Sequence, residues 1–506
     1  MEENKNSLPF EGAPALPVTL AFPTGKRELI LCAVVLLAAV LMANFLTVGG
    51  FYMAFGIASA VIIVATTVYL LRNGRKLTFY SGALLTFSVI IALSFGRSED
   101  GFVKFVMFIF LCFSANLGLC LLADKNHRDP KGFTSIADAF RAAFMLGLGK
   151  LSPAFSGLSN ARKNRKGSKA VSAVLAGLLI AVPLVLVLVV LLASADAAFE
   201  GLMKKLPKVD LWEPFVALIL GVPMGCFFYT RAAALQHAED IVPAQKTGSR
   251  ISTITINTVL GAVCFVYGVY LVSQLSYLSG GLSGILPEEF TMAEYARRGF
   301  FEMAVICTIN LFVISLAVGL TRKEDTSPLS TRLLCLFVGL VTLLLVAAAS
   351  AKMLTYIDGY GLTRLRVMTQ LIILFFGLAA VTVSVSMFLK TPRYMPVLLI
   401  GALLLGGSAF WVDVDTLVAA YNVSAYQHGV LETVDVEYLG TLSSGAIPQI
   451  AKLLDDQDPQ VAEAAQRVLN QKDVQWQDFR DWNYADWRAK PYVSPKEDSD
   501  HSQTEY

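Results

Sequence analysis

The chain has 506 residues, of which 55% are hydrophobic and only 16% charged, and its mean hydropathy is +0.60. Soluble domains are about 25% charged, so this composition, spread over many long apolar runs, excludes an ordinary soluble protein and indicates a polytopic membrane protein. The formal net charge of +2 is uninformative by itself because the charges are sorted along the chain.

The first 28 residues form a polar N-terminal tail, and an apolar run follows from Leu29 to Leu46. This run is longer than the core of a cleavable signal peptide, and a second apolar run follows at once. We therefore expect a retained first membrane helix.

A helix needs about 20 apolar residues to cross a membrane. The sequence predicts about eleven such helices, so the expected fold is an all-α bundle. Spans 1–4 occupy residues 29–123 and spans 5–11 occupy residues 170–411. The centres are near residues 38, 61, 86, 113, 181, 222, 262, 310, 342, 378 and 403. Pro183 and Pro223 lie within spans, where a proline either kinks a helix around a cavity or is simply tolerated.

The lysines and arginines predict the orientation. If the N-terminus is cytoplasmic, cytoplasmic segments hold 24 of them, outer loops and span edges hold 10, and the C-terminal tail holds 7. The tail from Val412 carries 17 acidic residues. We therefore expect a cytoplasmic N-terminus and an extracytoplasmic tail, and an error of one in the span count would reverse the tail.

Two segments outside the spans have helical periodicity. Residues 124–169 form a basic cytoplasmic segment, within which residues 134–159 predict a helix lying in the membrane plane. Residues 199–206, on the outer side, predict a second in-plane helix.

The predicted C-terminal segment, residues 412–493, is helical, and residues 494–506 have the composition of a disordered tail. It contains a pair of amphipathic helices, the second capped by Asp458 with Pro459 at its first position. One such pair cannot stand alone, so it must pack on the membrane domain or on a partner. Trp476, Trp482 and Trp487 are the candidate packing or partner contacts.

Two charged stretches stand at span ends. In "EYARRGFFEM", Glu294, Arg298 and Glu302 have i, i+4, i+8 spacing and share one helix face. On the predicted topology, the stretch "YIDGYGLTRLRV" lies on the same outer side, as do Asp413 and Asp415. The candidate outer-face cluster consists of Glu294, Tyr295, Arg297, Arg298, Glu302, Asp358, Tyr360, Arg364 and Arg366.

Five stretches carry a family resemblance: "ADAAF" (195–199), "YARRGFFE" (295–302), "YGLTRLRV" (360–367), "AAYNVSAY" (419–426) and "DWNYADWRA" (481–489). They resemble blocks of a bacterial membrane protein family catalogued as a domain of unknown function of the 4153/4173 type. The resemblance implies an integral protein of the bacterial cytoplasmic membrane with a short C-terminal extramembrane segment. It implies no catalytic residue.

The outer cluster has two interpretations. Its arginines either bind phosphate or carboxylate groups beside an acid or base, or the charges pair with one another and anchor the spans. The four histidines are split between the two sides, which predicts no metal site. The sequence indicates no cofactor, and the basic residues flank spans without a nucleic-acid stacking platform.

Three functions follow from these patterns. The leading hypothesis is a non-enzymatic envelope scaffold or sensory component whose outer face engages membrane lipids or, through the C-terminal segment, a partner protein. The alternatives are a transporter or flippase of a hydrophobic substrate and an outer-leaflet enzyme that uses the Glu, Asp and Arg cluster. Within the spans we expect only Lys104 and Glu302 to be charged, which argues against ion-coupled transport. We expect all seven cysteines to be small buried apolar residues.

Overall fold

In the described ranges of the computed structural model, every regular element is a helix, as the sequence predicts. The described residues are 21–48, 50–97, 99–124, 134–156, 212–237, 252–281, 300–320, 329–386, 388–389, 394–474 and 479–493.

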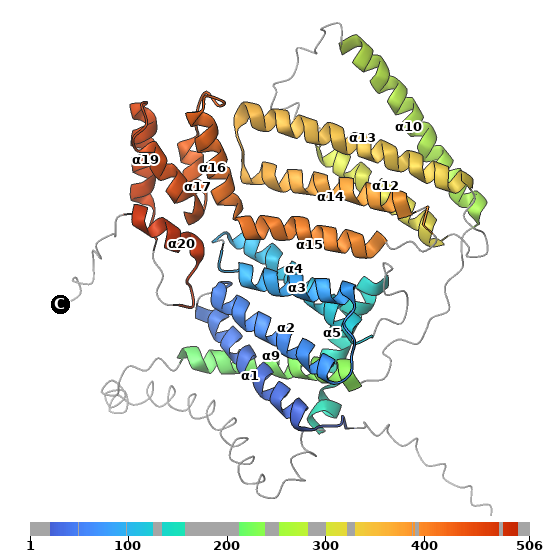
Figure 1. Cartoon of the computed structure of the whole chain (residues 1–506), viewed down its shortest axis with the longest axis vertical. Coiled ribbons are helices and arrows are strands. Elements are labelled where there is room, and N and C mark those ends of the chain that lie inside the picture. The colour runs from blue at the N-terminus through green and yellow to red at the C-terminus, as the bar shows by residue number, and fades with distance from the viewer. Residues whose placement is uncertain are drawn as a thin grey trace, which may run out of the picture.

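The N-terminal half forms one compact group of helices (Figure 1). It contains α1 (Lys26–Val48), α2 (Met53–Arg72), α3 (Phe79–Ser94), α4 (Gly101–Leu122), α5 (Thr134–Gly149) and α9 (Trp212–His237). The closest pair is α1 and α9, because Gly221 and Gly225 let the α9 backbone approach Val40 and Leu36 of α1. Small residues at helix contacts are the usual means of close packing in membranes.

A second group contains α10 (Thr253–Gly281), α12 (Phe300–Leu320), α13 (Leu329–Tyr360) and α14 (Arg364–Ser386). These helices enclose a separate apolar cluster that includes Leu260, Ile314 and Val338. Helix α15 (Tyr394–Val412) lies between the two groups and packs against α3 on one side and α14 on the other (Figure 1).

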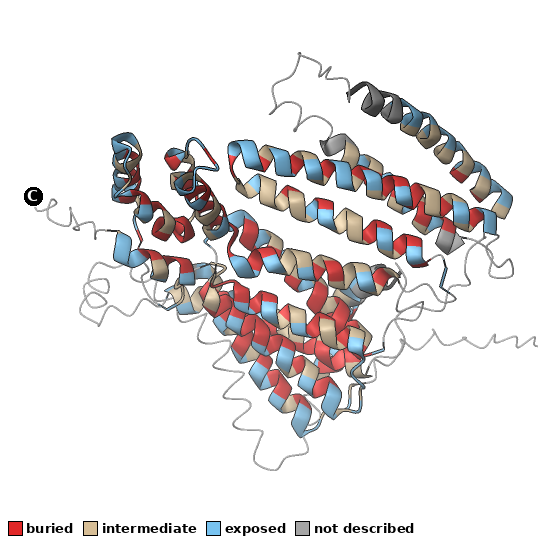
Figure 2. Cartoon of the chain, turned by 45° about the horizontal axis from the view of Figure 1, so that its top comes forward, coloured by how far each residue is buried: buried red, intermediate tan, exposed pale blue. Residues whose placement is uncertain are grey.

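Eight described helices are long and apolar enough to cross a membrane, and α3 and residues 303–317 of α12 are shorter apolar segments. Every predicted span centre except that near residue 181 falls within a described helix. The segment around 181 lies outside the described residues, so eleven spans stays a prediction. Exposed residues line the outer faces of the helices (Figure 2). They include large apolar side chains such as Leu37, Phe265 and Leu340, as expected of surfaces that face lipid.

Two expectations about the spans are wrong. Cys112 of α4 is exposed, whereas Cys32, Cys120, Cys307 and Cys335 are buried as predicted and Cys226 and Cys264 are partly buried. Cys112 lies on an outward face of its helix, where an apolar environment requires no burial inside the protein. Arg231 is a further charge within an apolar helix, and its guanidinium donates a hydrogen bond to the side-chain oxygen of Asn116 in α4. The sequence pattern missed it because the positive charge is satisfied by a polar residue far along the chain.

The C-terminal residues fold into a module of short helices, which we call the tail module (413–474 and 479–493). It contains α16 (Val414–Gln427), α17 (Val436–Thr441), η1 (Ser444–Ala446), α18 (Ile447–Ile450), η2 (Ala451–Leu453), α19 (Pro459–Gln471), α20 (Tyr484–Ala489) and η3 (Lys490–Tyr492). The predicted helix pair is present, although its first member is divided into η1, α18 and η2. Asp458 caps α19 by accepting a hydrogen bond from the Gln460 amide, and Pro459 follows it as predicted.

The tail module shares its hydrophobic core with the N-terminal group of helices. Val418, Leu439 and Ile447 belong to the same buried cluster as Leu84 and Met107 of α3 and α4. The module therefore packs on the membrane helices. This is one of the two arrangements expected for a helix pair that cannot stand alone, the other being packing on a partner.

Glu99 of the α3–α4 connection and Leu362 of the α13–α14 connection bond to the tail module at one end of the bundle, which we call the tail end. Tyr52, between α1 and α2, lies near Asp481 and Asp486 of the module at the same end. At the opposite end, Arg27 of α1 donates hydrogen bonds to Arg72 and Asn73, and Arg75 to Gln236 of α9. The described helices therefore alternate in direction between the two ends, and the side of the membrane that each end faces stays a prediction. The predicted in-plane helix at 134–159 includes α5, and the one at 199–206 lies outside the described residues.

Candidate functional site

The site begins at the turn between α13 and α14. Gly361 has φ of 73°, a left-handed conformation that glycine adopts without a Cβ penalty. The Asn422 side chain of α16 clamps the next residue: its oxygen accepts from the Leu362 amide at 2.6 Å, and its nitrogen donates to the Leu362 carbonyl at 2.8 Å. The stretch "YGLTR" is thus a turn fitted to the tail module, and it places Arg364 at the start of α14.

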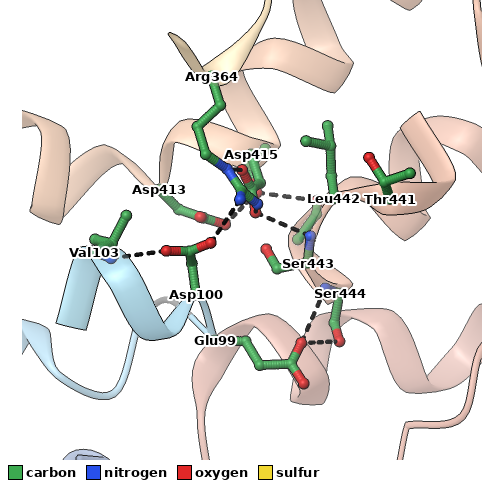
Figure 3. A network of polar contacts seen from close by, with 12 residues as sticks. Glu99, Asp100, Val103, Arg364, Asp413, Asp415, Thr441, Leu442, Ser443 and Ser444 are labelled. Carbon is green, nitrogen blue, oxygen red and sulfur yellow. Dashed lines mark hydrogen bonds and ion pairs between the residues drawn. The ribbon is translucent and has the colours of Figure 1, made fainter. Parts of the chain in front are cut away.

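Arg364 joins three parts of the chain (Figure 3). Its Nε and Nη2 donate to the two carboxylate oxygens of Asp415 in α16, at 2.7 and 2.6 Å. Its Nη1 lies 2.6 Å from Oδ2 of Asp100. Asp100 also caps α4, because its other carboxylate oxygen accepts from the Val103 amide at 2.7 Å. Paired arginine and carboxylate groups in this planar arrangement are among the strongest and most directional polar contacts in proteins.

Asp415 is held from the other side by the Ser443 amide, which donates to its Oδ2 at 2.9 Å. Burial by itself raises the pKa of the Asp415 carboxyl. The hydrogen bonds from Arg364 and Ser443 and the Arg364 charge outweigh it, so the net pKa is lowered. Asp415 is therefore ionised at neutral pH.

Asp413 lies two residues before Asp415, and the pKa of its carboxyl is shifted in the opposite direction. Its backbone has φ of 58°, one of only two non-glycine positive φ values among the described residues. Burial raises the pKa of its carboxyl to about 6, against the effect of a 2.7 Å hydrogen bond from the Thr416 hydroxyl. Strained backbone and a shifted pKa often coincide at functional positions.

A second layer of charges extends the network toward α20. Glu99 accepts hydrogen bonds from the amide and hydroxyl of Ser444 (Figure 3). The Lys104 ammonium lies 3.3 Å from the ring centre of Tyr52. Asp486 of α20 is buried, which raises the pKa of its carboxyl, and its Oδ1 has no hydrogen-bond partner within the described part of the chain.

The network has more carboxyl groups than cations. The carboxyl groups are those of Glu99, Asp100, Asp413, Asp415 and Asp486. The cations are Arg364, Lys104 near Glu99 and Asp486, Arg97 near Asp413, and Lys472, which interacts with Glu99 and Asp415 from the tail module. An acidic excess in a largely buried cluster is relieved by protonating the carboxyl of highest pKa. Asp413 and Asp486 are the members whose pKa is raised.

The sequence-predicted residues divide into three groups. Glu294, Tyr295, Arg297 and Arg298 lie outside the described residues, and so does the side chain of Glu302 in α12. Asp358 and Tyr360 are exposed at the end of α13. Arg366 stacks on Tyr356 at 3.9 Å and donates to the Tyr360 carbonyl at 2.9 Å, so it closes the turn. Only Arg364 of this cluster contacts carboxylates within the described residues.

The predicted tryptophan contacts are also separated. Trp476 lies outside the described residues, Trp482 is half-buried, and Trp487 is exposed and stacks on Tyr484 of the same helix.

Sequence reasoning missed Glu99, Asp100, Arg97 and Asn422 as members of this site. Asp100 carries a visible signal, because a "SED" stretch directly before an apolar run is typical of a helix N-cap. Nothing local could have paired it with Arg364, which lies more than 200 residues away in the chain.

A smaller polar cluster lies at the opposite end. The Tyr69 hydroxyl donates to Glu28 Oε1 at 3.1 Å and lies 3.1 Å from Nε2 of His237, which is 3.6 Å from the same Glu28 oxygen. It joins α1, α2 and α9 where their ends meet. Among the described residues, no group of three or more His, Cys, Asp or Glu side chains could hold a metal ion.

The fold and this network define a polytopic all-α membrane protein with a C-terminal module of short helices packed on one end of the bundle. The chain belongs to the family described as "Domain of unknown function (DUF4153)", whose model matches residues 29–453. That match includes every element of the Arg364 network except Asp486. No curated protein and no solved structure matches the chain. Membership of the 4173 type and a bacterial source stay predictions.

Proposed function

We propose that this protein is a non-enzymatic scaffold or sensory component of the cell envelope, which presents the tail module at the outer membrane face for contact with a partner protein or lipid headgroups. The single observation that carries the proposal is the attachment of the module. It is joined to the spans by a shared hydrophobic core and by the Arg364–Asp415–Asp100 network. A module held in this way presents its free surface in a fixed orientation, and any force on that surface is transmitted to the spanning helices.

The described surface of the module includes a cleft. It lies between α17 and α19, has a volume of about 390 Å³, and is lined by Glu437, Gly440, Thr441, Arg467, Val468, Gln471 and Lys472. Arg467 and Glu437 form an exposed ion pair at 3.2 Å across it. A polar cleft on an ordered module supports a protein-binding role, because it offers both signs of charge next to buried apolar side chains.

The transporter alternative requires a cavity near Pro183 and Pro223. Pro223 is exposed on α9, and the adjacent Gly221 and Gly225 pack tightly against α1. Pro183 lies outside the described residues. The enzyme alternative requires carboxylates and arginines that converge on an open cleft. In the described part of the site, Arg364 is engaged by two carboxylates and leaves little room for substrate.

The test is site-specific photo-crosslinking in the native cells. A photoreactive residue at Gln466, exposed on α19, should yield one discrete protein adduct, and the same residue at lipid-facing Leu340 of α13 is the matched control. The Gln466 adduct should be lost in Arg364→Gln, because this change loosens the module. It should also be lost in Arg467→Gln if the cleft is the contact site. Identical adducts at Gln466 and Leu340, or none at any exposed α19 position, would contradict the proposal.

The predicted side of the module needs its own measurement. Glu463→Cys places a thiol on the exposed face of α19, and a membrane-impermeant maleimide applied to intact cells should label it. The parent chain is the control because it retains Cys112. Labelling only after permeabilisation would place the module in the cytoplasm.

A further inference from the structure

The last described segment, residues 479–493, runs across the ends of several spanning helices, and we call it the strap. The Phe479 ring packs edge-on against Phe45 of α1, with ring centres 6.0 Å apart. Arg480 donates to Glu213 of α9 at 2.6 Å. The Tyr484 amide donates to the Gly96 carbonyl of the α3–α4 connection at 2.7 Å. The strap is thus tied to three separate parts of the N-terminal group.

The contacts of the strap fix its level along the helices. Phe45 lies three residues before the end of α1, and Glu213 is the second residue of α9. Arg97, which lies over the Tyr484 ring of the strap, also lies over the ring of Trp411, the penultimate residue of α15. Each residue of a helix rises by about 1.5 Å, so Phe45, Glu213 and Trp411 all lie within about 5 Å of a helix end. In a bundle whose α1, α9 and α15 cross a membrane, this level corresponds to the boundary between lipid headgroups and acyl chains.

The strap also has large, exposed apolar side chains. Phe479 is 70% exposed, Trp487 55% and Tyr492 49%. Trp212 and Trp411, at the same ends of α9 and α15, are 65% and 48% exposed. All the tryptophans that the structure describes therefore lie at the tail end. Tryptophan and tyrosine concentrate at membrane interfaces because their rings are apolar at one end and polar at the other.

The inner side of the strap has the opposite character. Asp486 and Asn483 of the α20 region are buried, and the Arg97 guanidinium lies 4.7 Å from the Trp411 ring centre and 5.3 Å from that of Tyr484. One short helix thus faces the ion network on one side and carries exposed aromatic rings on the other. Figure 1 shows α20 between the tail helices and the ends of the N-terminal group.

We propose that the strap is a lipid-interface anchor, in which Phe479, Trp487 and Tyr492 insert into the headgroup layer of the membrane that the bundle spans. The lipid surface is favoured over a protein partner because the Phe479 ring packs on Phe45 near the end of α1, where Leu41 one turn earlier is also exposed. The Trp487 ring stacks on Tyr484, which is bonded to the α3–α4 connection between two further helix ends. The inference rests on the proposed function only in taking the bundle to cross a membrane.

The test uses the full-length protein in vesicles of phosphatidylethanolamine and phosphatidylglycerol, with no other protein present. Nitroxide labels are attached at Trp487→Cys and, as the matched control, at Glu463→Cys on α19. The parent chain, which keeps Cys112, supplies the background signal. Power-saturation EPR then compares collisions with oxygen, which concentrates in lipid, and with a water-soluble nickel chelate.

We expect the ratio of oxygen to nickel collisions to be several-fold higher at position 487 than at 463. Equal ratios at the two positions would show that the strap faces water and would overturn the proposal. Low collision rates with both reagents at 487 would mean that a second copy covers the rings, which also overturns it. A failed crosslink from α19 would leave this result unaffected, so failure of the partner proposal and failure of the anchor are distinguishable.

Because Trp487 is exposed, its replacement should leave the fold intact, and the thermal midpoint of each labelled variant verifies this. Phe479→Cys is the second labelling position, since Phe479 is the more exposed ring and lies against α1. It should show the same lipid-like ratio as position 487.

Discussion

Arg364 and Asp415 form a bidentate ion pair, with Nε–Oδ1 and Nη2–Oδ2 distances of 2.7 and 2.6 Å, although 51 residues separate them in the chain. The pair joins the first residue of a spanning helix to the first turn of the tail module. Because Asp415 is almost fully buried, the loss of its partner leaves a charge without compensation.

Arg364→Gln should therefore loosen the module. Removal of one partner of a buried ion pair typically costs about 3–5 kcal/mol, and we expect a loss near the lower limit because Ser443 still donates to Asp415. The measurement is the thermal midpoint in detergent together with the rate of proteolysis within the tail. Arg467→Gln is the control, since its pair with Glu437 is exposed and should contribute less than about 1 kcal/mol. Equal effects of the two variants would refute this assignment.

The Arg364→Gln and Asp415→Asn changes should be far from additive. Arg364→Gln alone leaves the buried Asp415 carboxylate without its cation, and Asp415→Asn alone leaves Arg364 paired only with Asp100. The double variant removes both charges of the pair. We expect the double variant to be less destabilised than the sum of the single variants, as measured by the same midpoints. Simple additivity would mean that the pair is not coupled.

Asp413 should make the stability of the module depend on pH. Its pKa is about 6 in the fold, raised from an ordinary value of 3.8 by burial. The folded state therefore holds the proton more tightly than the unfolded state. The favourable contribution of this group is full below the unfolded pKa and is lost as the pH rises through about 6. A shift of about two units corresponds to about 3 kcal/mol.

Asp413→Asn should remove this loss and raise the thermal midpoint at neutral pH. Asparagine keeps an acceptor for the Thr416 hydroxyl and tolerates a positive φ. The comparison is best made between about pH 5 and pH 7. In this pH range Asp415, whose pKa is lowered, stays ionised. It therefore adds no pH dependence of stability with the opposite sign. An unchanged pH profile in the variant would show that Asp413 does not titrate in this range.

Gly361→Ala should be destabilising, whereas Gly359→Ala, two residues earlier, should not. A Cβ at 361 would lie 2.7 Å from the Asn422 side-chain oxygen, and its backbone has a positive φ. A Cβ at 359 meets no atom within 4 Å, and alanine favours a helix by about 1 kcal/mol over glycine. Thermal midpoints of the two variants provide the measurement, and a loss at 359 as large as at 361 would contradict the proposed turn geometry.

The contact between α1 and α9 can be tested with a second matched pair. A Cβ at Gly221 would lie 2.5 Å from the Val40 Cα, whereas a Cβ at Gly261 of α10 meets nothing within 4 Å. Gly221→Val should separate the two helices and lower the folded fraction in detergent, because the backbone atoms it meets cannot move aside. Gly261→Val should be tolerated. If both variants fold equally well, α1 and α9 are not in close contact.

Much of the architecture was readable from local pattern. The apolar runs predicted the helices around residues 38, 61, 113 and 342, because each run independently satisfies the length that a membrane requires. Asp458 before Pro459 predicted the start of α19, because capping depends on a few adjacent residues. The alternation of span ends likewise predicted that "YGLTRLRV" and Asp415 share one side.

Tertiary structure alone decided how those residues are used. Arg364 and Arg366 are two positions apart on one stretch, yet only Arg364 reaches Asp100 and Asp415, whereas Arg366 turns back to the Tyr360 carbonyl. The raised pKa of Asp413 and the lowered pKa of Asp415 arise from burial and partners that no local pattern encodes. Sequence by itself determined which segments are helical and which ends meet, since those follow from periodicity and length. The network depended on packing between segments that lie from 28 to 345 residues apart in the chain, because side-chain pairing is set by three-dimensional proximity.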